Sequence, residues 1–217
     1  MGSGGELMSE YGDMTLDQYR DALASDAPTP GGGTAAAVAL SQGAALAIMV
    51  CNLTDGKEKW KDGWGDAQAC RNIATPLLEL GHQLAADDAD SFDAVMSAYK
   101  LPRDTDEEIS NRRLAIQNAT LKAAMVPMET ANRAYELLEL LPTLARTGNA
   151  NAVTDVGVAG LLISAACKGA LFNVEINVSS LPNEVGGDLR SQLDELRNNC
   201  RDMARDVMHA VHDRMQS

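Results

Sequence analysis

The sequence Ala27-Pro28-Thr29-Pro30-Gly31-Gly32-Gly33-Thr34 leads directly into an apolar, alanine-rich segment that continues to Leu53. No charged residue occurs between positions 35 and 53, and small residues recur at every fourth position, at 35, 39, 43, 47 and 51. This pattern predicts a helix that is buried on all sides and that neighbouring helices can approach closely. Thr34 is the predicted N-cap of this helix. The glycine-rich loop before it is suited to bind a carboxylate or carbonyl group.

Capping signals and apolar spacing predict five further helices along the rest of the chain. They are a short amphipathic helix after Thr15, a helix from about 66 to 99 that contains Pro76, a helix from about 106 to 141 that contains Pro127, a second apolar helix from 154 to about 178, and an amphipathic last helix with its apolar stripe from 189 to 211. The predicted fold class is all-α. We expect a flexible N-terminus at 1–14 and a single-domain helical bundle of about six helices, two of them buried and apolar, at 15–217.

Composition and charge limit the partners, the cellular location and the assembly that we expect for this protein. The chain has 217 residues, 4% aromatic residues and a formal net charge of −13, which argues against nucleic acid or an acidic membrane surface as a partner. The four cysteines are widely spaced without a Cys-x-x-Cys motif, which is typical of reduced thiols in a cytoplasmic protein. The apolar segment at 35–53 approaches the ~20 residues of a membrane span, but its alanine content and the Ser41-Gln42-Gly43 interruption favour a buried helix. Because two apolar helices need more cover than four amphipathic ones provide, we predict a homodimer.

Asp88 is the predicted acid–base residue. It lies four residues after Leu84 and four before Phe92, so it shares the core-facing side of its helix, where a charge is unfavourable unless it is paired or functional. Burial and the adjacent Asp87 would both raise its pKa towards neutrality, as an acid–base group requires. The alternative is a structural ion pair with an arginine of the last helix.

Several other residues are candidates for substrate binding. Lys57, Lys59 and Lys61 concentrate positive charge in an acidic chain and form either a solvated loop or a clamp for an anionic group. Asn173 and Asn177 share one face of the second apolar helix, where buried amides bond either the backbone or a ligand. Asp155 lies at the start of that helix. There it either contacts a ligand or complements the helix dipole as an acid of the first turn. The three histidines do not converge with cysteines or carboxylates at metal-ligand spacing, so no metal site is predicted.

Motifs distributed over nearly the whole chain after residue 15 resemble those of a known family. They are Pro28-Thr-Pro-Gly-Gly-Gly-Thr34, Met49-Val-Cys-Asn-Leu-Thr54, Asp88-x-x-x-Phe92, Tyr99-Lys-Leu-Pro102, Val126-Pro127, Gly148-Asn149 and Phe172-Asn-Val-Glu-Ile-Asn177. In this order and spacing they resemble the cyclodeaminase/cyclohydrolase family of folate enzymes.

The resemblance implies an all-helical, dimeric enzyme that binds a one-carbon derivative of tetrahydrofolate, with no cofactor beyond that substrate. The acidic catalytic residue of the family falls on Asp88. Residues implied in substrate binding are Gly31, Gly32, Gly33 and Thr34 of the glycine-rich segment, Lys57 and Lys59 of the basic loop, and the pair Asn173 and Asn177.

Two activities occur in this family. Methenyltetrahydrofolate cyclohydrolases interconvert 5,10-methenyltetrahydrofolate and 10-formyltetrahydrofolate, and formiminotetrahydrofolate cyclodeaminases release ammonia to form the same cyclic compound. The residues of these motifs are most similar to those of stand-alone cyclohydrolases. We therefore predict cyclohydrolase activity first and cyclodeaminase activity second. A non-catalytic helical scaffold is the remaining alternative, because a fold alone does not establish a reaction.

Overall fold

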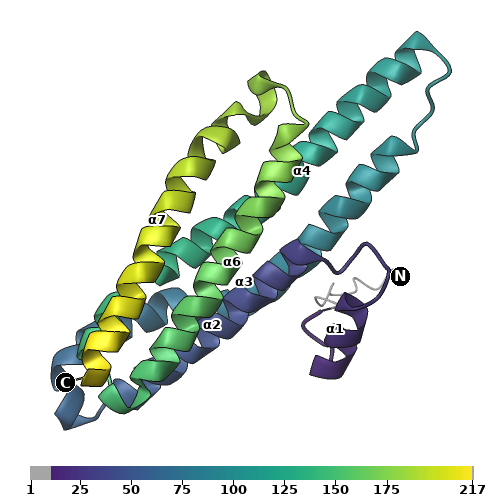
Figure 1. Cartoon of the computed structure of the whole chain (residues 1–217). Helices are drawn as coiled ribbons and strands as arrows, with labels where there is room; N and C mark the ends of the chain where they lie inside the picture. The colour runs from purple at the N-terminus through teal and green to yellow at the C-terminus, as the bar shows by residue number, and fades with distance from the viewer. Residues whose placement is uncertain (1–10, 217) are drawn as a thin grey trace, which may run out of the picture.

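The structure is a computed structural model that describes residues 11–216, and over that range it is a bundle of long helices without strands (Figure 1). The predicted flexible segment 1–14 therefore lies mostly outside the described residues. The α helices are α1 (Leu16–Leu23), α2 (Gly32–Thr54), α3 (Trp64–Tyr99), α4 (Asp106–Leu138), α5 (Leu141–Thr147), α6 (Val153–Ser179) and α7 (Asn183–Gln216). Two 3₁₀ helices, η1 (Glu58–Gly63) and η2 (Ala150–Ala152), lie before α3 and α6.

The two apolar helices pack antiparallel against each other at close range. A Cβ atom added at Gly43 of α2 would lie 2.7 Å from Cγ1 of Ile163 on α6, and one at Gly81 of α3 would lie 2.8 Å from Cβ of Ser41. Such distances are shorter than real Cβ contacts, so these glycines are what allows α3 and α6 to approach α2. The prediction of closely packed small faces is confirmed.

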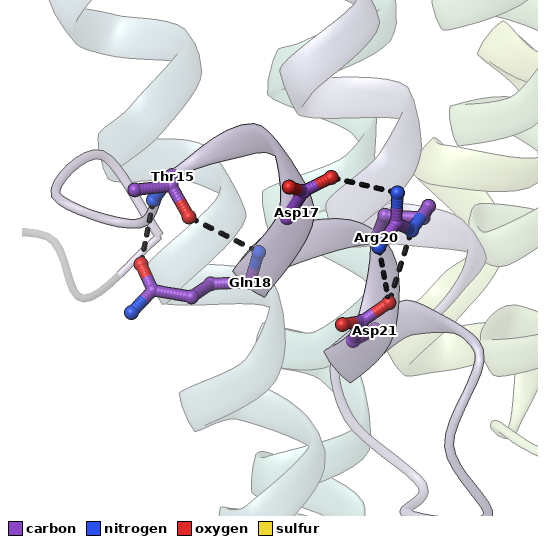
Figure 2. A network of polar contacts seen from close by, with 5 residues as sticks. All are labelled: Thr15, Asp17, Gln18, Arg20 and Asp21. Carbon is purple, nitrogen blue, oxygen red and sulfur yellow. Dashed lines mark hydrogen bonds and ion pairs between the residues drawn. The ribbon is translucent and has the colours of Figure 1, made fainter.

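Helix α1 lies beside the bundle and has no buried residue. Its predicted capping box is confirmed: the amide of Thr15 donates to Oε1 of Gln18 at 2.7 Å, and the amide of Gln18 donates to Oγ1 of Thr15 at 3.2 Å. Figure 2 shows this pair and the ion pairs of Arg20 with Asp17 and Asp21. Because all of these groups are exposed, their contribution to stability is small.

Prolines occupy both interior and first-turn positions of these helices. Pro76 and Pro127 lie inside the continuous helices α3 and α4. Pro142 was expected to follow the end of the long helix, but that helix ends at Leu138 and Pro142 lies in the first turn of the additional helix α5. A proline is compatible with a first turn because the N–H it lacks would have no partner there.

The apolar helices are not buried on all sides in a single chain. On α6, Leu161, Phe172 and Ile176 are 60%, 67% and 68% exposed, and on α2 Met49 and Leu53 also face solvent. Both helices are long and apolar enough to cross a membrane by length and composition alone, which is weak evidence because the buried core helix of a soluble protein passes the same test. The expectation of complete burial is therefore corrected: each helix keeps one apolar face open.

All four cysteines are buried free thiols, as expected from their apolar surroundings. The fold nevertheless brings them together in two pairs, Cys51 with Cys70 between α2 and α3, and Cys167 with Cys200 between α6 and α7. Their spacing in the sequence gave no sign of this pairing.

Candidate active site

A cavity of about 330 Å³ lies beyond the N-terminal end of α2. Figure 1 shows α3 and α4 continuing past this end of α2, so the start of α2 faces the space between its longer neighbours. The cavity is lined by the glycine-rich segment and by side chains of α3, α4 and α6, namely Pro28, Thr29, Gly31, Gly32, Gly33, Asp88, Ser91, Phe92, Val95, Ala123, Asn173, Ile176 and Asn177.

Asp88 of α3 lies directly beneath the first turn of α2. Its Oδ2 accepts a hydrogen bond from Oγ1 of Thr34 at 3.2 Å, and the backbone amide of Thr34 also donates to this carboxyl group. Burial raises the pKa of Asp88 above its ordinary value, and the two bonds from Thr34 partly oppose that shift by favouring the charged form. A carboxyl group in this environment can exchange a proton with a substrate more readily than an exposed aspartate.

Thr34 is not the N-cap that the sequence suggested. Gly31 is the N-cap, it makes no side-chain capping bond, and Thr34 lies fully buried inside the first turn. The side chain of Asp88 therefore supplies, from another helix, an acceptor for an N–H group that α2 leaves unpaired. Asp88 stabilises the end of α2 and is available for chemistry at the same place.

Gly33 is required for the close approach of Asp88. A Cβ atom at this position would lie 2.6 Å from Cγ of Asp88, so an alanine would displace the carboxyl group. Gly32 is less constrained, because a Cβ atom there would be 3.8 Å from Nδ2 of Asn173. The glycine-rich segment thus has a definite steric role at one position, in addition to exposing backbone to the cavity.

The two asparagines of α6 reach the same cavity from the opposite side. Nδ2 of Asn173 donates to the carbonyl of Gly169 at 2.9 Å, and Nδ2 of Asn177 donates to the carbonyl of Ala123 at 2.8 Å. The first alternative for this pair, a bond to the backbone, is therefore observed, and binding of a ligand stays a prediction. The amide nitrogens bond the backbone, which fixes the two side chains at the lining of the cavity.

Sequence reasoning missed several lining residues of α3. Ser91, Phe92 and Val95 follow Asp88 at intervals of three, four and seven residues, so they share its helix face. Oγ of Ser91 donates to the carbonyl of Asp88 at 2.8 Å. The helical spacing from Asp88 could have identified all three, whereas Ala123 and Ile176 lie on other helices and carry no such signal.

Lys57, Lys59 and Asp155 do not lie at this cavity within one chain. The lysines follow the C-terminal end of α2, and Asp155 is in the first turn of α6, which runs antiparallel to α2. A helix of 23 residues is about 34 Å long, so this group lies at the opposite end of the bundle core. Their predicted role in substrate binding stays a prediction.

A larger hollow, of about 510 Å³, lies on the other side of the Thr29–Pro30 segment, between it and α3. Its charged lining consists of Asp87, Asp90 and Asp93, and it does not include Asp88. Within residues 11–216 no group of three or more histidine, cysteine, aspartate or glutamate side chains could hold a metal ion. The smaller cavity is therefore the better candidate, because it combines a carboxyl group of raised pKa with fixed amide acceptors.

A family model described as formiminotransferase-cyclodeaminase matches residues 15–210. The chain belongs to this family. Membership agrees with the positions of the motifs, since the glycine-rich segment, Asp88 and the two asparagines of α6 meet at one cavity.

Two relatives within the formiminotransferase-cyclodeaminase family differ in length. A methenyltetrahydrofolate cyclohydrolase of Methylorubrum extorquens is 40% identical over 179 residues, which cover 82% of this chain and 86% of that protein. A formimidoyltransferase-cyclodeaminase of Gallus gallus is 37% identical over 172 residues, 78% of this chain but only 31% of the relative. The chain thus spans most of the first relative and about a third of the second.

The fold also matches a solved member of the formiminotransferase-cyclodeaminase family. The crystal structure of formiminotetrahydrofolate cyclodeaminase from Thermotoga maritima superimposes with a TM-score of 0.77 at 27% identity, covering 94% of this chain and 96% of that chain. The shared architecture confirms the predicted all-helical class.

Proposed function

We propose that the protein is a methenyltetrahydrofolate cyclohydrolase that interconverts 5,10-methenyltetrahydrofolate and 10-formyltetrahydrofolate, with Asp88 as its acid–base residue. The observation that carries this proposal is the buried carboxyl group of Asp88, whose pKa is raised, at a cavity of a chain that is 40% identical to a cyclohydrolase over most of that relative's length. No cofactor besides the folate substrate is part of the proposal, and the cytoplasm is its expected location.

The first step is the addition of water to the cationic N5–C–N10 carbon. The carboxylate of Asp88 accepts one proton of the attacking water while the oxygen bonds to carbon, which gives a neutral carbinolamine. The negative charge of Asp88 also stabilises the cationic substrate. Such acid–base assistance typically contributes about 10²–10⁴-fold in rate.

The second step opens the ring. Protonated Asp88 returns its proton to N5 as the C–N5 bond breaks, and the hydroxyl proton leaves for solvent as the formyl C=O forms on N10. One water is consumed and one proton is released overall. In this proposal the glycine-rich segment, Asn173 and Asn177, which line the cavity, orient the substrate around the reacting carbon.

The test follows the near-ultraviolet absorbance of 5,10-methenyltetrahydrofolate in a weakly nucleophilic buffer at neutral pH. We expect the wild-type protein to accelerate the decay well above the buffer rate. Asp88→Asn should abolish this acceleration, and it is preferable to Asp88→Ala because an amide oxygen can still accept the bonds from Thr34 that hold the end of α2.

The cyclodeaminase is the second candidate, supported by the fold match to the Thermotoga maritima enzyme. The same absorbance band separates the two activities. If it grows from 5-formiminotetrahydrofolate and the methenyl compound does not decay, the protein is a cyclodeaminase. If neither change occurs, the chain is a non-catalytic scaffold.

A homodimer is also part of the proposal. Helices α2 and α6 pack against each other, and their exposed apolar side chains include Met49, Leu53, Leu161, Phe172 and Ile176. Exposed apolar side chains in such numbers favour an interaction site. Leu161→Glu, which places a charge on the exposed centre of this face, should convert a dimer into a helical monomer as measured by analytical ultracentrifugation and circular dichroism.

A further inference from the structure

The Asp88 cavity is followed by a second hollow, which we call the Tyr99 hollow and which has a volume of about 180 Å³. Three helices contribute to both. On each of them, the cavity residue and the hollow residue closest in sequence are three or four positions apart, namely Val95 and Tyr99 on α3, Ala123 and Thr120 on α4, and Asn177 and Ser180 at the end of α6. Because this spacing is about one helical turn, the Tyr99 hollow lies directly beyond the cavity, where α3 and α4 continue past the start of α2 (Figure 1).

The cavity and the Tyr99 hollow differ in charge. Asp88 is the single charged residue among the described residues that line the cavity, whereas Arg113 of α4 is the single charged one that lines the Tyr99 hollow. Arg113 is exposed, and it forms no ion pair with another residue of the range 11–216. In a chain of net charge −13, an arginine without a carboxylate partner is available to bind an anionic group of a ligand.

The neighbouring arginine holds Tyr99 in place. Nε and Nη2 of Arg112 donate to the carbonyl of Tyr99 at 3.3 and 3.0 Å, and Cζ of Arg112 lies 5.5 Å from the centre of the Tyr99 ring. These contacts join the end of α3 to α4. The Tyr99 ring is 52% exposed, so it is held beside the hollow while much of its surface stays open to a ligand.

The lining of the Tyr99 hollow matches the aminobenzoyl-glutamate portion of a folate substrate, which consists of an aromatic ring, an amide and carboxylates. Tyr99 and Ile116 offer aromatic and apolar surface to the ring. The side-chain amide of Gln117 can bond the amide of the ligand. Arg113 can bind a carboxylate through two parallel N–H bonds. The hollow therefore provides the cation that the Asp88 cavity lacks.

The direction of the helices is also consistent with this match. Tyr99 follows Asp88 by eleven positions on α3, which corresponds to about 16 Å along the helix axis. In the substrate, the aromatic ring and the amide separate the reacting carbon from the glutamate carboxylates. A substrate whose reacting carbon lies at Asp88 can therefore extend along α3 and α4, with its ring towards Tyr99 and its glutamate towards Arg113.

We propose that Tyr99 and Arg113 form the subsite for the aminobenzoyl-glutamate portion of the substrate, with Tyr99 against the ring and Arg113 bound to a carboxylate. The inference rests on the proposed function, because it takes Asp88 as the position of the reacting carbon. The subsite consists of residues of a single chain. It does not involve Lys57 or Lys59, whose role stays a prediction.

A cationic hollow elsewhere in the chain is the alternative. It has a volume of about 310 Å³ and is lined by residues of α6 and α7, among them Lys168, Arg197 and Arg201. Both arginines already form ion pairs with carboxylates of this chain. Lys168 lies five residues before Asn173, so these two residues lie on different sides of α6. This hollow is therefore less suited to a substrate whose reacting carbon lies at Asp88.

The experiment compares two substrates that differ only at the glutamate end. One is 5,10-methenyltetrahydrofolate, and the other is the corresponding methenyl derivative of tetrahydropteroate, which lacks the glutamate. Arg113→Gln should raise the KM of the first about tenfold, because a charge-assisted bond is lost, and should leave kcat nearly unchanged. With the second substrate, the variant and the wild type should have the same KM.

Two further variants complete the comparison. Arg103→Gln is the matched control, because it removes an exposed arginine of the α3–α4 connection that lines neither hollow, and its KM values should equal those of the wild type. Tyr99→Ala should raise the KM of both substrates, because both contain the aromatic ring, whereas Tyr99→Phe should keep the wild-type values.

An unchanged KM in Arg113→Gln would overturn the inference. An equal increase of KM with both substrates would also overturn it, because the effect would then not depend on the glutamate. The same holds for an equal increase in Arg103→Gln, or for an increase in Lys168→Gln that is confined to the folate substrate. A wild-type protein inactive in both folate assays would instead contradict the proposed function, and this inference would fail with it.

Discussion

The two ends of α2 differ in how completely their polar groups are paired. At the C-terminal end, Oγ1 of Thr54 donates to the carbonyl of Val50 at 2.8 Å and accepts from the amide of Asn149 at 3.0 Å. Nδ2 of Asn149 and Nε1 of Trp64 donate to the last carbonyls of the helix. At the N-terminal end no α2 side chain caps the helix, and a carboxyl group of α3 lies there instead.

From this difference we infer that the C-terminal end of α2 has a structural role and that its N-terminal end takes part in the reaction. Where every donor meets an acceptor inside the chain, substitutions are expected to reduce stability. Where a half-buried carboxyl group and two asparagines line a cavity, substitutions are expected to reduce turnover.

Asp88→Asn should have the largest effect on catalysis. We expect kcat to fall at least about 100-fold with KM nearly unchanged, because binding groups remain and only proton transfer is lost. A decrease of less than tenfold in the methenyltetrahydrofolate assay would remove Asp88 from the mechanism.

The same variant should not lose stability at neutral pH. The pKa of Asp88 is raised in the folded protein, so the stability linked to its protonated form is fully present below the pKa of the unfolded chain and is lost as pH rises through the folded pKa. At pH 7 the neutral asparagine avoids this loss. We expect an equal or higher Tm than wild type at pH 7, with the difference shrinking towards pH 3, as measured by calorimetry.

Gly33→Ala should lower kcat by about 10–100-fold, because its Cβ atom would displace the carboxyl group of Asp88 and misplaced catalytic groups lose rate steeply. The matched control is Gly65→Ala on α3, where an added Cβ atom meets nothing within 4 Å. The control should keep the wild-type kcat. Equal kcat values for the two variants would contradict the steric role of Gly33.

Thr54→Val should reduce the free energy of unfolding by about 1–3 kcal/mol while kcat stays at the wild-type value, because the partly buried backbone amide of Asn149 loses its acceptor. Urea unfolding followed by circular dichroism measures this change. Thr75→Val is the matched control, since its hydroxyl also donates to a carbonyl four residues earlier, at 2.8 Å, but is exposed. A loss of activity at unchanged stability in Thr54→Val would instead indicate that the reaction takes place at the C-terminal end of α2.

The smallest effect concerns pH. Because the pKa of Asp88 is raised, kcat/KM should decline on the acid side at a pH above the ordinary pKa of aspartate. Thr34→Val removes a hydrogen bond that lowers this pKa, so the acid limb should move to higher pH. A shift to lower pH would show that Thr34 does not act on the carboxylate.

Periodicity and caps were sufficient to predict six of the seven α helices in the described range and the catalytic candidate. The capping boxes at Thr15 and Thr105 predicted two helix starts. In each, the threonine hydroxyl accepts from the backbone amide three residues later, and the side chain of that later residue accepts from the backbone amide of the threonine. Asp88 was identified because a charge on a core-facing position is unfavourable unless it has a role. These features depend on neighbours along one helix, so they can be read from the order of residues.

The site itself depended on which helices lie side by side. The sequence does not show that Asp88 caps α2 from another helix, that Gly33 makes room for it, or that Asn173 and Asn177 face it from α6, because these contacts join residues more than 50 positions apart. Nor does it show that the basic loop lies at the far end of α2, a consequence of helix length and direction. The sequence determined most of the helices, the caps at Thr15 and Thr105 and the candidate for proton transfer, whereas antiparallel packing decided which candidates share one cavity.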